Sequence, residues 1–358
     1  MEECSVYTLI NMKNKSFLVL VTVCSTIFLW ILYLNFFESD AVDYHFFDRN
    51  ITSNNNLIFE KLVDKFSKNE YIDDIPSNDS IIELEKKVID TNNVDYKLYI
   101  SDFGFRNKSL KTAKMPNGCN VLFYKNNQIY FTKKFKLFSC DLKTNSIVNY
   151  PLVNMKISVI KFLHNSFDEI MVFGEQQKDN KFLSGFFKIS LKTLKINPVK
   201  IIETNNDSKF LSNSLKYVGE FTYSKTDSIL SYACDKYSRV FFFSIKGEFK
   251  KVLLTKDESP IPLILTNENG DSFYGRGTYN TNTACFVKNG FIYVFSARAK
   301  NKLDLIIDRY SYNNLKYDKS YKIKCKNYCS KDITNLFIDV NGIILSFTTN
   351  YVSLKFSR

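Results

Sequence analysis

Histidine, tryptophan and glycine are scarce in this sequence, and the common catalytic motifs are missing. The chain has two histidines, one tryptophan and 11 glycines among 358 residues. His45 and His164 alone offer little material for histidine-based acid–base catalysis or for a metal site. No nucleophile elbow, zinc-protease motif, P-loop or dinucleotide-binding glycine pattern occurs. We therefore expect no cofactor, no bound metal and no catalytic residue, and the sequence names no reaction.

Charge is absent from one long apolar run, residues 16–37. As a helix with a rise of about 1.5 Å per residue, the run would be about 33 Å long, enough for a bilayer core of about 30 Å. A cleaved signal peptide is one alternative, but its apolar region would be shorter, and only 39–41 resembles a cleavage site. A lipoprotein signal ending at Cys24 is another, but Val23 stands where a small residue is needed. We expect an uncleaved transmembrane helix.

The flanks of the apolar run predict its orientation. Two lysines lie in 13–15, and three acidic residues lie in 38–43. Lysine and arginine favour the cytoplasmic side of a membrane. We expect 1–15 to be a cytoplasmic tail and 38–358 to lie outside the cytoplasm, on the periplasmic side of a single-pass membrane protein.

Charge is unevenly distributed in the remainder. Residues 38–100 hold 14 acidic and 7 basic residues, a net charge of −7, whereas residues 101–358 hold 21 acidic and 40 basic residues, a net charge of +19. A basic surface attracts acidic lipid headgroups or cell-envelope polymers. The alternative is a set of scattered, solvated lysines. Nucleic acid is not expected as a partner outside the membrane.

Cysteines are few outside the anchor, and they do not form a metal motif. Six lie beyond residue 37: Cys119, Cys140, Cys234, Cys285, Cys325 and Cys329. The close pair Cys325 and Cys329 favours a local disulfide in an oxidising compartment. Free buried thiols are the alternative for the others.

Residues 38–95 are rich in asparagine and acids and show no clear period-2 strand. Apolar spacing predicts a helix over 57–68, and a capping-box pattern at 80–83 predicts a second helix reaching about residue 90. We interpret 38–95 as a partly helical stalk that precedes a separate domain, 96–358.

The domain 96–358 is built from similar pieces of short aromatic strands and polar turns. Each piece combines a turn such as KNNQIYF or KNGFIYVF with a second turn such as CDLKTNSI or FSIKGEF. The pieces cover 120–150, 157–202, 216–254, 283–323 and 335–356. Periods of about 40 to 50 residues with four short antiparallel strands are typical of propeller blades. We expect a mainly β fold, a six-bladed β-propeller, with five or seven blades as alternatives, and with 96–101 completing the short last piece.

These repeats resemble a group of uncharacterised, envelope-anchored six-bladed β-propeller proteins of Bacteroidetes, related in shape to TolB-like propellers. The similarity is carried by 216–257, KYVGEFTYSKTDSILSYACDKYSRVFFFSIKGEFKKVLLTKD, and by 284–356 with IIDRYSY and YDKSYKI. It implies a propeller anchored in the envelope. It carries over no catalytic residue, because the group has none assigned.

The irregular segment 256–282 holds the best candidate binding residues. Arg276 stands between two glycines, with Tyr274 and Tyr279 nearby. A loop arginine flanked by tyrosines suits an anionic ligand, because guanidinium groups pair with anions and aromatic rings stack. The alternative is an ordinary turn with a solvated arginine.

Two classes of function remain open. We expect a binding or scaffold module without catalysis, whose partner is another envelope protein or an acidic ligand. The rival is an enzyme, either a glycosidase-like propeller or a subunit of an envelope redox complex. Propeller glycosidases use inward carboxylates, and the candidates here would be Asp102, Glu220, Asp271 and Asp308.

Overall fold

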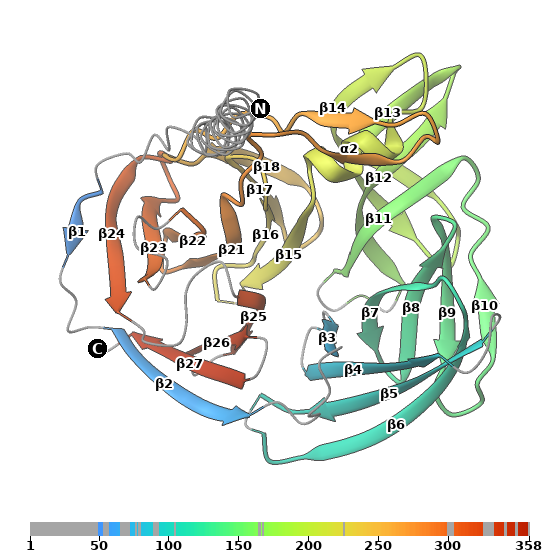
Figure 1. Cartoon of the computed structure of the whole chain (residues 1–358), viewed down its shortest axis with the longest axis horizontal. Coiled ribbons are helices and arrows are strands. Elements are labelled where there is room, and N and C mark those ends of the chain that lie inside the picture. Colours follow the sequence, from blue (N-terminus) through green and yellow to red (C-terminus); the bar gives the residue numbers. More distant parts are fainter. Residues whose placement is uncertain are drawn as a thin grey trace, which may run out of the picture. The chain divides into compact units, whose positions relative to one another are not determined.

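β-Strands dominate the chain, as the aromatic and β-branched composition predicts. The computed structural model describes residues 49–52, 57–64, 72–75, 77, 80–88, 93–103, 105–163, 166, 168–224, 226–298, 304–324, 333–339, 342–347 and 350–356. Within these residues the strands form five sheets of four strands, one of five and one of two (Figure 1). The prediction of a mainly β fold is confirmed.

Each large sheet is built chiefly from consecutive antiparallel strands. The first contains β3 (Ile72–Ile75), β4 (Ile81–Val88), β5 (Asn93–Ser101) and β6 (Lys108–Pro116), and the second contains β7 (Asn120–Lys125), β8 (Gln128–Lys133), β9 (Lys136–Asp141) and β10 (Ile147–Asn149). The third contains β11 (Met155–Phe162), β12 (Glu169–Lys178), β13 (Lys181–Ser190) and β14 (Ile196–Asn205), and the fourth contains β15 (Gly219–Ser224), β16 (Ile229–Cys234), β17 (Arg239–Ser244) and β18 (Phe249–Leu254). The fifth contains β21 (Asn282–Lys288), β22 (Phe291–Ser296), β23 (Asp304–Ser311) and β24 (Tyr317–Lys324), and the sixth contains β25 (Ile333–Asp339), β26 (Gly342–Phe347) and β27 (Asn350–Phe356).

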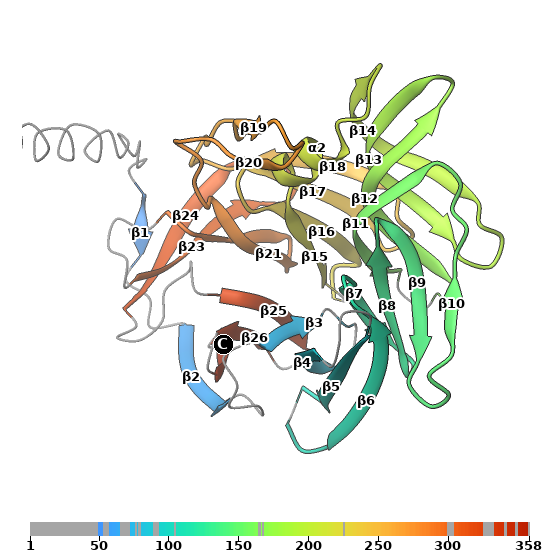
Figure 2. The same ribbon diagram turned by 45° about the vertical axis from the view of Figure 1, so that its right-hand side comes forward.

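Two strands from the start of the described chain complete the last two sheets. The short β1 (Ile51–Thr52) pairs in parallel with β24, and β2 (Leu57–Asp64) pairs antiparallel with β27. The smallest sheet is a hairpin of β19 (Ile264–Thr266) and β20 (Ser272–Tyr274), which contacts α2 (Phe210–Lys216). Figure 2 shows this hairpin and α2 side by side. The prediction that 96–101 completes the last piece was wrong, because those residues lie in β5 of the first sheet and β2 fills that place.

The predicted asparagine turns form hairpins. Asn126 and Asn127 have φ of 50° and 63°, and Asn289 and Gly290 have φ of 52° and 75°. Two residues with positive φ make the turn whose twist matches the twist of the flanking strands, and asparagine and glycine tolerate that conformation best. Local sequence is therefore sufficient to fix these two turns.

The sheets pack on one another in sequence order, and the last sheet returns to the first. A hydrophobic cluster joins each consecutive pair of sheets from β3–β6 through to the sheet of β25–β27. A smaller cluster of Ile81, Ile344 and Tyr351 joins the last sheet to the first, and the Tyr351 hydroxyl donates to the Glu83 carboxylate over 2.9 Å. Burial of each large aromatic side chain in such clusters contributes about 1.5–3 kcal/mol. The apolar core therefore lies between the sheets.

The two predicted helices in 38–95 were wrong. Residues 57–64 form β2, and Ile81–Val88 forms β4. Glu83, which suggested a helix cap, is fully buried and accepts the Tyr351 hydrogen bond instead. Backbone pairing with other strands outweighs the local helical pattern: β2 pairs with β27, and β4 pairs with β3 and β5.

The predicted stalk boundary is also corrected. It falls inside β5, which pairs with β4 on one side and β6 on the other. Phe46–Arg358 forms one compact unit, so its strands before residue 96 belong to the β domain rather than to a separate stalk.

Several predictions fall outside the described residues. The anchor 16–37, the cytoplasmic tail 1–15 and the cysteine pair 325 and 329 are among them. In the part of the chain that the structure describes, no helix has the length and apolarity needed to cross a membrane. The cysteines at 119, 140, 234 and 285 are free thiols.

Candidate functional site

The segment between β18 and β21 holds the predicted binding residues, and each of its central glycines has a structural reason. The Gly275 amide donates to the Leu263 carbonyl over 2.7 Å, and a Cβ at Gly275 would lie 2.9 Å from the Leu263 side chain. Gly277 has φ of +83°, a conformation that side chains disfavour. The glycines therefore let the chain turn tightly on both sides of Arg276.

This segment covers a small cavity of about 120 Å³. The residues around it contribute two cations, hydroxyl groups and apolar side chains, and none of them is acidic. They are Lys236, Ser259, Pro260, Ile261, Pro262, Leu263, Arg276, Gly277, Thr278 and Tyr279. The lining therefore carries two positive charges and no negative one, which favours an anionic group.

The three predicted residues take different positions. Arg276 is exposed, and it makes no ion pair or hydrogen bond with any residue that the structure describes. Tyr279 lines the cavity beside it, and the Arg298 guanidinium lies 5.3 Å from the centre of the Tyr279 ring. Tyr274 does not line the cavity, because its hydroxyl donates to the Leu215 carbonyl over 3.1 Å and holds the β19–β20 hairpin on α2. The structure thus brings Arg276 and Tyr279 together at the cavity and gives Tyr274 a supporting position.

Lys236 is the cation that sequence reasoning missed. It lies just after β16, bonds through its ammonium to the Asn280 side chain, and stands 5.3 Å from the centre of the Tyr274 ring. A cation over an aromatic face gains about 0.5–1 kcal/mol at exposed sites. No local signal marked Lys236, because Tyr274 lies 38 positions further along the chain and only the fold brings the two residues together.

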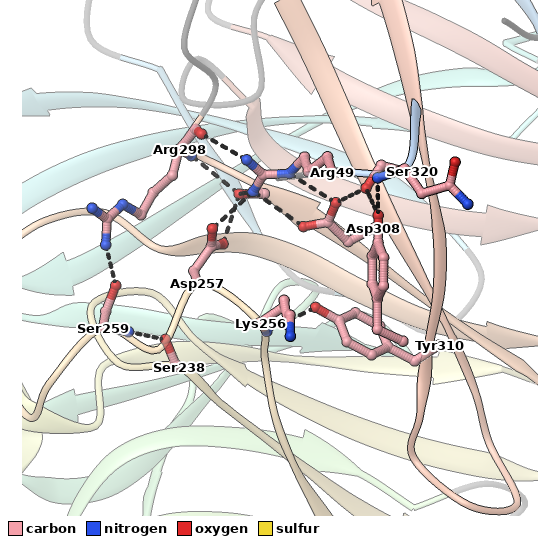
Figure 3. Close-up of polar contacts among 12 residues, drawn as sticks. Arg49, Ser238, Lys256, Asp257, Ser259, Arg298, Asp308, Tyr310 and Ser320 are labelled. Carbon is pink, nitrogen blue, oxygen red and sulfur yellow. Dashed lines mark hydrogen bonds and ion pairs between the residues drawn. The ribbon is translucent and has the colours of Figure 1, made fainter. Parts of the chain in front are cut away.

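A buried polar network supports the cavity from behind (Figure 3). The Arg298 guanidinium donates to the Ser259 hydroxyl over 2.8 Å, and the Ser259 amide donates to the Ser238 hydroxyl. On the same loop, Asp257 pairs with the Arg49 guanidinium over 2.8 Å. Ser259, which lines the cavity, is therefore held by two neighbours and cannot turn freely.

Arg49 joins the start of the described chain to this network. Its guanidinium also pairs with Asp308 over 3.0 Å and donates to the Arg298 carbonyl over 3.2 Å. Burial acts to lower the pKa of Arg49, but the carboxylates of Asp308 and Asp257 outweigh it and raise that pKa. Burial raises the pKa of Asp257, and Arg49 acts against that rise. The two aspartates and the two arginines balance in charge, so the positive charge of the cavity lining is that of Lys236 and Arg276 alone.

The four candidate carboxylates do not meet in one catalytic group. Asp308 is buried beside Arg49, Asp271 binds the Asn267 amide group in the exposed β19–β20 turn, and Asp102 accepts hydrogen bonds from the 106–107 turn. Glu220 lies on β15 and contributes to the electrostatics of Asp235. Among the described residues, no cluster of three histidine, cysteine or acidic side chains has metal-binding geometry.

Asp235 is a titratable group that the sequence did not single out. Burial raises its pKa well above the usual range, the Glu220 carboxylate raises it further, and Lys236 acts in the opposite direction. The pKa of Tyr274 is raised to about 12, by burial and then by Asp235. Asp235 therefore takes up a proton far more readily than a solvated aspartate does.

No family model and no curated protein sequence matches the chain. Solved structures with some similarity include the WD40 domain of Toxoplasma gondii coronin, with 8% identity over 87% of this chain and 90% of that chain and a TM-score of 0.43. A Bacteroides vulgatus protein from a family named only as a domain of unknown function has 11% identity over 86% of this chain and 99% of that chain, with a TM-score of 0.44. Staphylococcus aureus virginiamycin B lyase has 12% identity over 84% of this chain and 99% of that chain, with a TM-score of 0.42. These scores are too low to carry an assignment, so the proposals below depend on the residues of this chain alone.

Proposed function

We propose that this chain is a membrane-anchored, extracytoplasmic six-bladed β-propeller that binds an anionic group and catalyses no reaction. The blade count is supported by six large sheets packed in sequence order, with β2 completing the sixth sheet beside β27. The anchor and its orientation are supported by the uncharged run 16–37 and by the lysines before it.

One observation carries the binding proposal. Arg276 and Lys236 line the same cavity, no acidic residue lines it, and Arg276 makes no ion pair within the described chain. A structural arginine would be expected to have a partner, as Arg49 and Arg309 do. Arg276 is therefore free to pair with a carboxylate or phosphate oxygen of a ligand.

The size of the cavity limits the ligand to a small group. A volume of about 120 Å³ is well below the range of about 300–1,000 Å³ that is typical of small-molecule sites. That space suits a single carboxylate or phosphate group, with the rest of the partner outside. An acidic side chain of another envelope protein, or an acidic group of an envelope polymer, meets this requirement.

The test measures binding of inorganic phosphate and of poly-glutamate to the full chain by calorimetry, in 0.1 M and 1 M salt. Arg276→Ala should weaken binding about tenfold at low salt, since a charge-assisted hydrogen bond of about 1.5 kcal/mol is lost. The difference should shrink in 1 M salt, where the Debye length falls from about 10 Å to about 3 Å. Arg106→Ala, at an exposed arginine in another turn, is the matched control. Equal affinity of wild type and Arg276→Ala would remove this loop from the site.

Topology is tested separately with intact spheroplasts. External protease should degrade the 38–358 portion if the N-terminus lies in the cytoplasm. Complete protection of that portion would reverse the proposed orientation without affecting the binding proposal.

A further inference from the structure

A second and larger crevice, of about 490 Å³, lies between the sheet of β7–β10 and the sheet of β11–β14. It shares no lining residue with the cavity at Arg276. Its lining residues are Lys134, Lys136, Leu137, Asn149, Tyr150, Pro151, Leu152, Val153, Asn154, Met155, Lys156, Ile157, Glu175, Gln177 and Phe182. The volume falls within the range of about 300–1,000 Å³ that is typical of small-molecule sites.

Backbone hydrogen bonds hold the walls of this crevice in place. The segment between β10 and β11 is tied to the second sheet through the Tyr150 amide and the Leu137 carbonyl, over 3.0 Å. It is tied to β12 through the Gln177 amide and the Asn154 carbonyl, over 2.9 Å. A ligand that enters a preformed site pays little for ordering the protein.

The crevice is lined by apolar side chains and by lysines. Among the apolar lining residues, Val153 is 73% exposed, and Leu152 and Phe182 are half-buried. Lys134 and Lys136 are exposed, and neither makes an ion pair or hydrogen bond through its side chain with a described residue. An apolar surface below two unpaired ammonium groups is complementary to a molecule that has an apolar body and an anionic end.

The lining holds one carboxylate against three lysines, so its net charge stays positive. Glu175 is 2% exposed. It accepts hydrogen bonds from the Ser208 hydroxyl, from the Ser184 hydroxyl over 3.2 Å and from the Lys209 amide over 3.1 Å. Lys156 donates to the Ser208 hydroxyl over 2.9 Å. Glu175 is therefore committed to the start of α2, and Lys134 and Lys136 remain available.

The turn that contains Lys134 and precedes Lys136 departs from the residue preference of its turn type. Lys134 and Phe135 have φ of 49° and 63°, whereas the corresponding turn between β12 and β13 uses Asp179 and Asn180. Asparagine, aspartate and glycine tolerate this conformation, while lysine and phenylalanine are strained in it. Phe135, which is 39% exposed, lies edge-on against Phe210, with the two ring centres 4.6 Å apart. Such strain is commonest where a side chain serves a ligand.

From these observations we infer that the crevice binds a small amphipathic anion. An apolar body contacts Leu152, Val153 and Phe182, and a carboxylate, sulfonate or phosphate group pairs with Lys134 and Lys136. The inference is independent of the binding proposed at Arg276, because the two sites have no residue in common.

The probe is naphthalene-2-sulfonate, titrated by calorimetry into the full chain in nanodiscs of zwitterionic lipid, with empty nanodiscs as the blank. Its uncharged analogue, naphthalene-2-sulfonamide, measures the contribution of the negative charge. The variant is the double substitution Lys134→Glu with Lys136→Glu, which changes only exposed side chains. The matched control is Lys192→Glu with Lys195→Glu, at two exposed lysines in the turn between β13 and β14. Thermal unfolding followed by circular dichroism checks that both variants are folded.

We expect one probe per chain, at least about tenfold weaker binding in the Lys134/Lys136 variant, and unchanged binding in the control. The sulfonamide should also bind at least about tenfold more weakly than the sulfonate, which corresponds to about 1.4 kcal/mol. No binding to the wild type, an equal loss in both lysine variants, or equal binding of sulfonate and sulfonamide would overturn the inference. A loss in Arg276→Ala as large as that in the Lys134/Lys136 variant would place the probe in the smaller cavity and would also overturn it.

Discussion

Replacing Arg49 with methionine should destabilise the β domain strongly at neutral pH. The Arg49 side chain is 7% exposed, and its two carboxylate partners, Asp257 and Asp308, are 2% and 1% exposed. Methionine keeps much of the apolar stem but removes the charge and its hydrogen bonds. Because Asp257 follows Arg49 by 208 residues and Asp308 follows it by 259, the substitution tests a contact that exists only in the folded chain.

The magnitude follows from burial. Removing one partner of a buried ion pair costs about 3–5 kcal/mol, because a buried charge is left uncompensated. Each kcal/mol lost from the free energy of unfolding lowers the melting temperature by on the order of 2 °C in a domain of this size. We therefore expect the melting temperature of Arg49→Met to fall by roughly 6–10 °C. Arg49 now opposes the rise that burial causes in the pKa of Asp257, and without Arg49 that pKa should rise further. A carboxyl pKa that is raised in the folded state costs stability only at a pH above the pKa of the unfolded aspartate, about 3.9. The stability that Arg49→Met loses should therefore shrink as the pH falls toward 4.

The assay is thermal unfolding of the full chain by circular dichroism at pH 7.5 and pH 4. Arg106→Met is the control, because Arg106 is exposed and a surface substitution of this kind usually changes stability by less than about 0.5 kcal/mol. Arg49→Met with Asp308→Asn should lose less stability than Arg49→Met alone at pH 7.5. A shift within 1 °C of the control, or a loss of equal size at both pH values, would refute the reasoning.

Two further predictions concern single residues. Asp235→Asn should be more stable than wild type at pH 7 and equal to it near pH 3. The reason is that the raised pKa of Asp235 costs stability as the pH rises from about 3.9, the pKa of an unfolded aspartate, through the folded pKa. Melting curves across this pH range test the prediction, and a variant less stable than wild type at pH 7 would contradict it. Gly219→Ala should cost about 1–3 kcal/mol, because the new Cβ would lie 2.0 Å from the backbone oxygen of Ala233. Gly275→Ala, whose Cβ would meet only the Leu263 side chain at 2.9 Å, should cost less stability. Urea unfolding of both glycine variants measures the two losses, and the reverse order would disprove this account.

Local sequence was enough to predict the strand-rich character of 96–358 and its asparagine turns. Asparagine and glycine at 126–127 and 289–290 accept positive φ, so two hairpins follow from a few adjacent residues. The glycines beside Arg276 likewise indicated an irregular loop, and the structure puts Arg276 and Tyr279 on one cavity. These features depend on conformational preferences that each residue carries with it.

The tertiary structure decided the features that depend on distant partners. Residues 57–64 and 81–88 have apolar spacing and polar residues that suit a helix, yet each forms a strand because a neighbouring strand offers a full row of hydrogen-bond partners. The pairing of Arg49 with Asp308 and the meeting of Lys236 with Arg276 leave no trace in local sequence. A side chain's burial and charge environment is a property of the packed sheets, because it is the fold that removes water and brings separated residues within contact distance.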